Sequence, residues 1–180
     1  MKNINSDLQM MVYASLLAAL TAVGAYLSIP IGPVPIVLQS LFILLAGVLL
    51  GRKWGTASVG IYLLAGAFGL PVFAGGAGGM GRFFGPTGGY LLGFLPAVYI
   101  TGLISEKRKK NVLMDVFAMT CGSVLIYAFG ISWLKVITGM GLNKAVAVGM
   151  LPFLPGDALK IAAAAFIARS VRPLIGNGRS

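Results

Sequence analysis

Six long apolar runs dominate this sequence and restrict what the chain can fold into. Each approaches the roughly 20 residues with which a helix crosses about 30 Å of hydrocarbon. Barrel strands would be shorter and would alternate between polar and apolar residues, which these runs do not. We therefore predict an all-α fold, an integral membrane bundle of six transmembrane helices in a single domain over residues 1–180. The runs cover approximately residues 8–29, 34–50, 54–71, 87–105, 112–134 and 145–170.

The composition excludes several other classes of protein. Hydrophobic residues make up 58% of the chain, and charged residues 10%, against roughly 25% in soluble domains. A soluble domain of this size leaves too much surface in water to hide so much hydrocarbon, so the net charge of +10 does not indicate nucleic-acid binding. Histidine is absent, and the chain has one cysteine and four carboxylates. We therefore predict that the protein is not an enzyme and holds no metal or cofactor.

The basic residues predict the orientation, because cytoplasmic loops carry an excess of lysine and arginine. With the N-terminus inside, ten basic residues lie on the cytoplasmic side and three on the outer side, and Lys160 lies within a span. We predict that both termini are cytoplasmic and that these residues act as topology anchors with no catalytic role. The ten are Lys2, Arg52, Lys53, Lys107, Arg108, Lys109, Lys110, Arg169, Arg172 and Arg179, and the three are Arg82, Lys135 and Lys144.

The three connections on the predicted outer side have unusual compositions. Residues 29–39 hold three prolines within six positions, residues 70–90 contain a glycine-dense run, and residues 151–160 contain two prolines. Irregular backbone at membrane depth is tolerated only where it lines a cavity or is covered by protein. One such segment is explained equally well as a tight turn. Three of them on one face predict a shared ligand pocket.

Asp157 and Lys160 are the strongest candidates for ligand binding. Counting back from Arg169 and Arg172 at 1.5 Å per residue places Asp157 about 8–12 Å below the outer surface. Lys160 lies one helical turn deeper on the same face, and ionisable residues at such depth mark functional sites. Alternatively, Asp157 only caps the last helix while Lys160 neutralises it. A carboxylate beside an ammonium suits a neutral ligand group with N–H and C=O edges, such as a urea or an amide.

Three further polar residues are weaker candidates for the same pocket. Arg82 would suit a ligand carboxylate, although a solvated loop charge explains it equally well. Gln39 falls just inside the second apolar run, and Tyr90 follows the glycine-rich segment. We predict that all three contribute polar contacts to the ligand.

The glycine run contains the pattern G-x-G-x-x-G at residues 76–81. It lacks a preceding soluble strand and a suitably spaced carboxylate, so we do not interpret it as a dinucleotide site. We predict instead a mobile lid over residues 75–82, in which Gly75 and Gly78 allow the backbone to approach the ligand closely.

Four ordered motifs are V-P-I-V-L-Q at 34–39, G-L-P-V-F-A-G at 69–75, G-P-T-G-G-Y at 85–90 and P-G-D-x-x-K at 155–160. Over about residues 10–172 they resemble the BioY family, the biotin-binding S components of energy-coupling factor (ECF) vitamin transporters. The resemblance implies that Asp157 and Lys160 belong to the biotin pocket, together with Gln39, Tyr90 and the glycine loop. Some members place an asparagine in that loop where this chain has Met80.

The resemblance also implies a location and partners. It implies capture of extracellular biotin at the plasma membrane of a prokaryote, with a transmembrane coupling protein and two ATP-hydrolysing subunits supplying the energy. No P-loop motif occurs in this chain. Ala14, Ala18 and Ala22 resemble the small-residue motif by which S components dock on the coupling protein, and such spacing lets helices approach closely.

Three alternatives remain at this stage. The same scaffold could bind another small vitamin, the chain could be a membrane-embedded enzyme acting on lipids, or it could be a purely structural subunit. The enzyme is disfavoured because neither histidine nor a pair of carboxylates converges on the outer cavity. A structural subunit predicts no stabilisation by a ligand.

Overall fold

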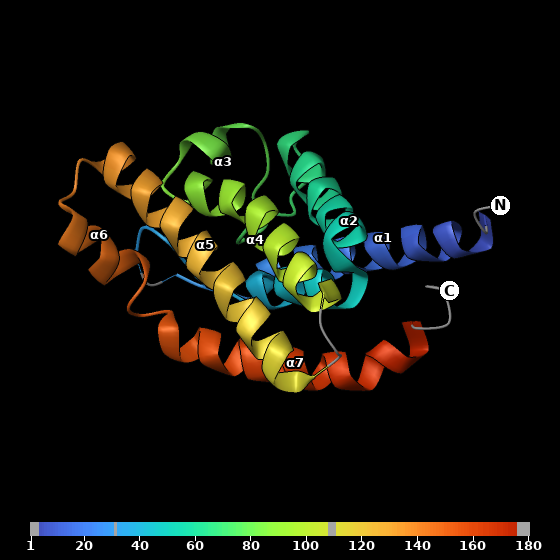
Figure 1. Cartoon of the computed structure of the whole chain (residues 1–180). Coiled ribbons are helices and arrows are strands. Elements are labelled where there is room, and N and C mark those ends of the chain that lie inside the picture. The colour runs from blue at the N-terminus through green and yellow to red at the C-terminus, as the bar shows by residue number, and fades with distance from the viewer. Residues whose placement is uncertain (1–3, 31, 108–110, 176–180) are drawn as a thin grey trace.

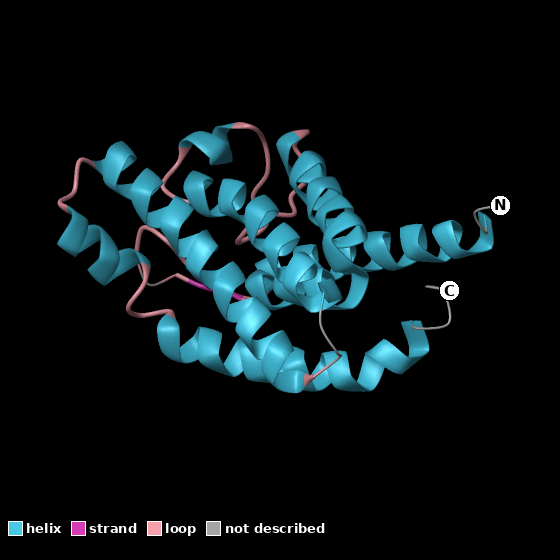
Figure 2. Ribbon diagram, viewed as in Figure 1, coloured by secondary structure: helices cyan, strands magenta, loops and turns pink. Residues whose placement is uncertain are grey.

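The computed structural model of the protein describes residues 4–30, 32–107 and 111–175, and most of them are helical (Figures 1 and 2). A short antiparallel hairpin joins the first two helices, with Ser28 paired to Val37 and Ile29 to Ile36. The elements in order are α1 (Ile4–Tyr26), β1 (Ser28–Ile29), β2 (Ile36–Val37), α2 (Gln39–Ala67), α3 (Gly81–Phe84), α4 (Gly88–Lys107), α5 (Val112–Thr138), α6 (Leu142–Gly149) and α7 (Leu154–Ile175).

The helix α2 is broken at Gly51, where φ is 75° and ψ is −175°. Residues nine apart in a straight helix are separated by about 13 Å. A side-chain carbon at Gly55 would instead lie 2.9 Å from the carbonyl oxygen of Ala46, so the two halves of α2 fold back against each other. Glu106 stabilises the break, because its Oε1 accepts a hydrogen bond of 2.9 Å from the backbone N–H of Arg52.

The lengths and compositions of the helices confirm the prediction of a multi-pass membrane protein. Four described helices are long and apolar enough to cross a membrane, or five when α6 and α7 count as one span bent by 49°. The bend falls at residues 150–153, beside Pro152 and Pro155, where the sequence predicted a break. The sequence predicted two separate helices over residues 34–50 and 54–71. The break at Gly51 lies close to that predicted boundary, and the two halves form the single broken helix α2.

The first turn of α1 and the last turn of α7 lie at the same end of the molecule, at the right of Figure 1. The β1–β2 hairpin and α6 lie toward the opposite end. The central element is α2, which packs against α1, α4 and α7. Small residues allow close approach there, since a side-chain carbon at Gly47 would lie 2.9 Å from Cβ of Thr101 on α4.

The docking alanines predicted on α1 do not form an exposed face. Ala14 and Ala18 are only 2% and 7% exposed, and Ala22 is half-buried. The carbonyl of Ala14 accepts a hydrogen bond of 2.7 Å from Ser58 on α2. In the isolated chain these alanines serve the packing of α1 on α2, and their contact with a partner stays a prediction.

Arg172 is more than the topology anchor that the charge count predicted. Its Nη2 lies 2.8 Å from Oδ1 of Asp115, and the two side chains are only 12% and 4% exposed. The same nitrogen donates to Ser105 Oγ at 3.2 Å and to the carbonyl of Val48 at 3.4 Å. This buried ion pair joins α7 to α5, α4 and the first half of α2.

Candidate functional site

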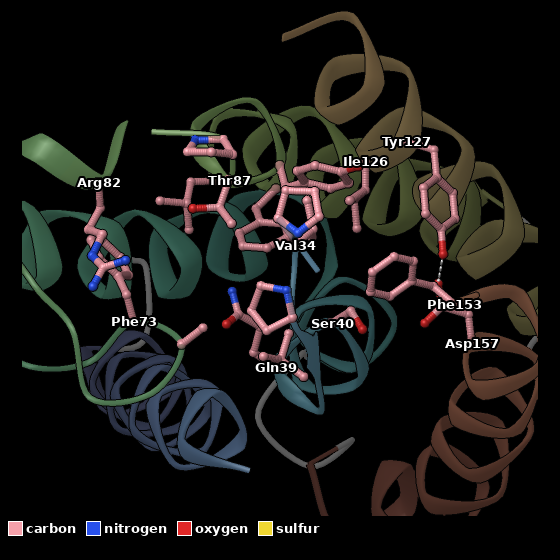
Figure 3. A pocket seen from close by; sticks show the side chains of 18 of the residues that line it. Val34, Gln39, Ser40, Phe73, Arg82, Thr87, Ile126, Tyr127, Phe153 and Asp157 are labelled. Atoms are coloured by element: carbon pink, nitrogen blue, oxygen red, sulfur yellow. Dashed lines mark hydrogen bonds between the residues drawn. The ribbon is translucent and has the colours of Figure 1, made fainter. Parts of the chain in front are cut away.

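A cavity of about 200 Å³ lies where the β1–β2 hairpin, the glycine-rich segment and the start of α7 meet. The cavity is larger than a packing void, because a single water molecule needs only about 10–15 Å³ of cavity volume. Its wall is mainly apolar, with a few polar groups that come from α2, α3, α4, α5 and α7 (Figure 3). The lining residues are Pro33, Val34, Pro35, Val37, Gln39, Ser40, Phe73, Ala74, Arg82, Gly85, Pro86, Thr87, Tyr90, Leu91, Phe94, Ser123, Ile126, Tyr127, Phe153, Asp157 and Lys160.

Asp157 and Lys160 form an ion pair in the wall of this cavity. Lys160 Nζ lies 2.9 Å from Asp157 Oδ1, and the side chains are 10% and 17% exposed for lysine and aspartate. The backbone N–H of Asp157 donates to the carbonyl of Phe153 at 2.8 Å, so Asp157 already lies inside the first turn of α7. Its side chain hydrogen-bonds to other side chains and is not an N-cap. The two residues do neutralise each other, as the alternative interpretation expected.

Tyr127 and Ser40 complete the polar group around this pair. The Tyr127 hydroxyl donates to Asp157 Oδ2 (Figure 3), and Lys160 Nζ donates to Ser40 Oγ at 3.2 Å. Sequence reasoning missed both residues. Tyr127 lies in the middle of the apolar run 112–134, and a phenol hydroxyl at that position is the sequence feature that could have indicated a polar contact. Ser40 directly follows Gln39 at the start of α2, so its position alone could have suggested it.

Gln39 and Tyr90 also line the cavity. Gln39 is the first residue of α2 and is 3% exposed. The Tyr90 hydroxyl donates a hydrogen bond of 2.8 Å to the carbonyl of Gly149, so its proton is already used to tie α4 to the end of α6. Tyr90 therefore presents mainly its ring to the cavity.

Arg82 lies across the cavity from Asp157, at the opposite side of Figure 3. It is exposed, belongs to the short helix α3, and takes part in none of the ion pairs found among the described residues. The cavity therefore has a neutralised ion pair at one side and an uncompensated cation at the other. This arrangement suits an elongated ligand with a neutral polar head and an anionic tail.

Gly75 and Gly78, unlike the five other predicted site residues, are not among the residues that line the cavity. A side-chain carbon at Gly78 would lie 2.3 Å from the carbonyl oxygen of Leu70, so this glycine is needed for packing within the loop. Gly75 has a φ of 70° and its N–H donates to the carbonyl of Ala25 at 3.3 Å. Both glycines shape the glycine-rich segment, whose residues Phe73, Ala74 and Arg82 line the cavity.

The loop is fastened to the helices on either side of it. Phe73 is 3% exposed and its ring packs edge-on against Tyr62 and Phe83. The Gly79 N–H donates to the carbonyl of Gly66 at 2.7 Å, and the Tyr26 hydroxyl donates to the carbonyl of Pro71 at 2.5 Å. The opening and closing of a lid over residues 75–82 stays a prediction.

The fold and the cavity together define a class: a multi-pass membrane protein that encloses a site for a small, elongated molecule. The comparison with protein families identifies the family within this class. The model of the BioY family matches residues 1–177, and the chain belongs to this family.

Named relatives and a solved structure agree with this assignment. The chain is 41% identical over 167 residues to the biotin transporter BioY of Thermotoga maritima, covering 93% of this chain and 98% of that protein. It is 44% identical over 158 residues to the probable biotin transporter BioY of Pyrococcus horikoshii, covering 88% and 93%. The crystal structure of the S component for biotin from an ECF-type ABC transporter matches with a TM-score of 0.89 and 33% identity, covering 95% of this chain and 94% of that one.

Proposed function

We propose that this protein captures biotin from outside the cell, as the substrate-binding S component of an ECF-type transporter. The observation that carries the proposal is the cavity with the Asp157–Lys160 pair at one side and Arg82 at the other. Membership of a family whose relatives are named biotin transporters supports the choice of ligand.

The chemistry of biotin fits this arrangement. Asp157 accepts hydrogen bonds from the ureido N–H groups, and Lys160 donates to the ureido carbonyl. Apolar side chains such as Val34, Phe94 and Ile126 pack against the thiophane ring and the aliphatic chain. Arg82 receives the carboxylate at the far end.

The proposed topology has six spans in one domain over residues 1–180, with both termini in the cytoplasm of a prokaryote. The two halves of α2 then cross separately, and α6 with α7 forms the last span. The chain reversal at Gly51 and the common end occupied by the start of α1 and the end of α7 support this topology.

The energy for transport comes from a transmembrane coupling protein and two ATP-hydrolysing subunits. The ECF-type ABC transporter from which the matching S component derives supports such partners. On α1, the small residues that remain exposed are Ser15 and Ala19, one position beyond the buried Ala14 and Ala18. A docking partner would meet this neighbouring face.

Competition binding tests the ligand. Membranes containing the protein are incubated with radiolabelled biotin and an excess of unlabelled biotin, thiamine or riboflavin. The proposal predicts that only unlabelled biotin displaces the label. Displacement by another vitamin at lower concentration than biotin would instead support an S component for that vitamin.

A further inference from the structure

The Ser40 hydroxyl has an unused hydrogen-bond donor inside the cavity. Its oxygen accepts from Lys160 Nζ at 3.2 Å, and an ammonium can only donate, so the hydroxyl proton is not used in this contact. Serine in a helix often donates to the carbonyl four residues earlier, but that residue is Ile36, which lies in β2. Within residues 4–30, 32–107 and 111–175, Ser40 donates to no other group.

The neighbouring polar groups leave a defined set of positions for a ligand. Lys160 has three donor hydrogens, of which two point to Asp157 and Ser40, so one remains. Asp157 accepts from Tyr127 on one oxygen and from Lys160 on the other, and each oxygen retains a lone pair. The cavity wall therefore offers two donors, on Ser40 and Lys160, beside the two carboxylate oxygens of Asp157 as acceptors.

We propose that Ser40 is a ligand-binding residue, and that Ser40 and Lys160 donate together to a single carbonyl oxygen of the ligand. A carbonyl oxygen has two lone pairs, and donors 3.2 Å apart can both reach it. A hydroxyl that accepts from an ammonium is polarised and becomes a stronger donor. Resting on the proposed function, this carbonyl is the ureido carbonyl of biotin, whose adjacent N–H groups face Asp157.

A ligand and residue cycle tests this pairing. Calorimetric titration measures the affinity of the wild-type protein, Ser40→Ala and Ser40→Thr for biotin and for 2-thiobiotin, in which sulfur replaces the ureido oxygen. Loss of one hydrogen bond predicts that Ser40→Ala weakens biotin binding about 5- to 10-fold. Because sulfur accepts hydrogen bonds weakly, 2-thiobiotin binding changes less than about 2-fold. Ser40→Thr keeps the hydroxyl and retains the wild-type preference for biotin.

Equal weakening of both ligands in Ser40→Ala would overturn the proposal, since Ser40 would then act only by holding Lys160. Unchanged affinity for both ligands would overturn it as well. If Ser40→Ala does not fold, Ser40→Cys supplies the same comparison with a weaker donor and predicts an intermediate loss for biotin alone. The series begins with the titration of the wild-type protein with biotin. If the wild-type protein does not bind biotin, the proposed function fails, and the role of Ser40 is then not the cause.

Discussion

The side chain of Asp157 is held from two sides, by Lys160 on its own helix and by Tyr127 on α5. A carboxylate so fixed keeps its remaining lone pairs in one direction, toward the cavity. The ion pair also neutralises both charges at a place where an unpaired charge would be costly. At the scale of single residues, we therefore expect Asp157 and Lys160 to touch the ligand and Tyr127 to orient Asp157.

Tyr127 is expected to orient Asp157, and Tyr127→Phe tests this. The substitution removes the hydroxyl that donates to Asp157 Oδ2 and keeps the ring. Hydrogen bonds to charged groups contribute about 1.5–3 kcal/mol, so we expect biotin affinity to fall about 10-fold or more in calorimetric titration. The matched control is Tyr99→Phe, because Tyr99 is 42% exposed and outside the cavity lining. Equal affinities for the two variants would contradict the orienting role.

The sequence identified the part of the site that is local along the chain. Asp157 and Lys160 lie one turn apart on one helix, so their spacing alone predicted their juxtaposition. Tyr127 was missed because its contact with Asp157 joins two helices, and no spacing in the sequence encodes that contact. The glycines of the loop were assigned to the ligand because their small size was interpreted as space for a ligand. At Gly78 the backbone of Leu70 occupies the space that a side chain would need.

At the scale of elements, the sharp reversal at Gly51 brings the two halves of α2 together. Its φ of 75° with ψ of −175° belongs to a region of backbone conformation that is essentially restricted to glycine. The charged residues Arg52 and Lys53 predicted an interruption close by. They did not predict that Glu106 from α4 would hydrogen-bond to the first free N–H after it.

Gly51→Ala tests the importance of this reversal for stability. The new side-chain carbon would lie 2.0 Å from Glu106 Oε1 and would displace that carboxylate, in addition to the backbone strain. We expect the free energy of unfolding to fall by about 1–3 kcal/mol from strain alone, seen as a lower melting temperature in detergent.

The matched control is Gly60→Ala in the second half of the same helix. Nothing lies within 4 Å of the added carbon there, and the helical backbone accepts alanine. We expect an unchanged or higher melting temperature, since alanine in a helix is favoured over glycine by roughly 0.5–1 kcal/mol. A variant Gly51→Ala as stable as Gly60→Ala would show that the reversal does not require glycine.

The buried pair of Arg172 and Asp115 ties four helical segments together at the other end of α7. Asp115→Leu leaves Arg172 without a counter-charge, and we expect a loss of about 3–5 kcal/mol in stability, measured by thermal unfolding. Arg172→Met in the same chain should restore part of that loss. The control is Arg52→Ala, whose pair with Glu106 is half exposed and should contribute no more than about 1 kcal/mol. Equal effects of Asp115→Leu and Arg52→Ala would contradict the account of the buried pair.

At the scale of the whole molecule, the cavity lies beside the β1–β2 hairpin, and the start of α1 and the end of α7 lie at the other end (Figure 1). The charge count along the sequence predicts that the end with the termini is cytoplasmic, and this orientation stays a prediction. Because charge counts concern loops and not packing, they could not show that Arg172 is buried or that Ala14 and Ala18 face α2. Those features depend on contacts between helices that only the folded chain specifies.

Labelling of single cysteines tests this orientation in intact cells. In a chain with Cys121→Ala, the matched variants Lys53→Cys and Lys144→Cys each replace an exposed lysine. We expect a membrane-impermeant maleimide to label position 144 from outside and position 53 only after the cells are opened. Labelling of position 53 in intact cells would contradict the proposed topology.

The central claim is that Asp157 and Lys160 bind the vitamin and do not merely stabilise each other. Isothermal titration of the purified protein with biotin, compared with the double variant Asp157→Asn with Lys160→Met, tests it most directly. The double variant removes both charges together, so it avoids an uncompensated buried charge, and its melting temperature serves as the control for folding. We predict one biotin per wild-type chain and an affinity at least about 100-fold weaker in the folded double variant, as expected when several charge-assisted hydrogen bonds are lost. A folded double variant that binds biotin as tightly as the wild-type protein would contradict the claim.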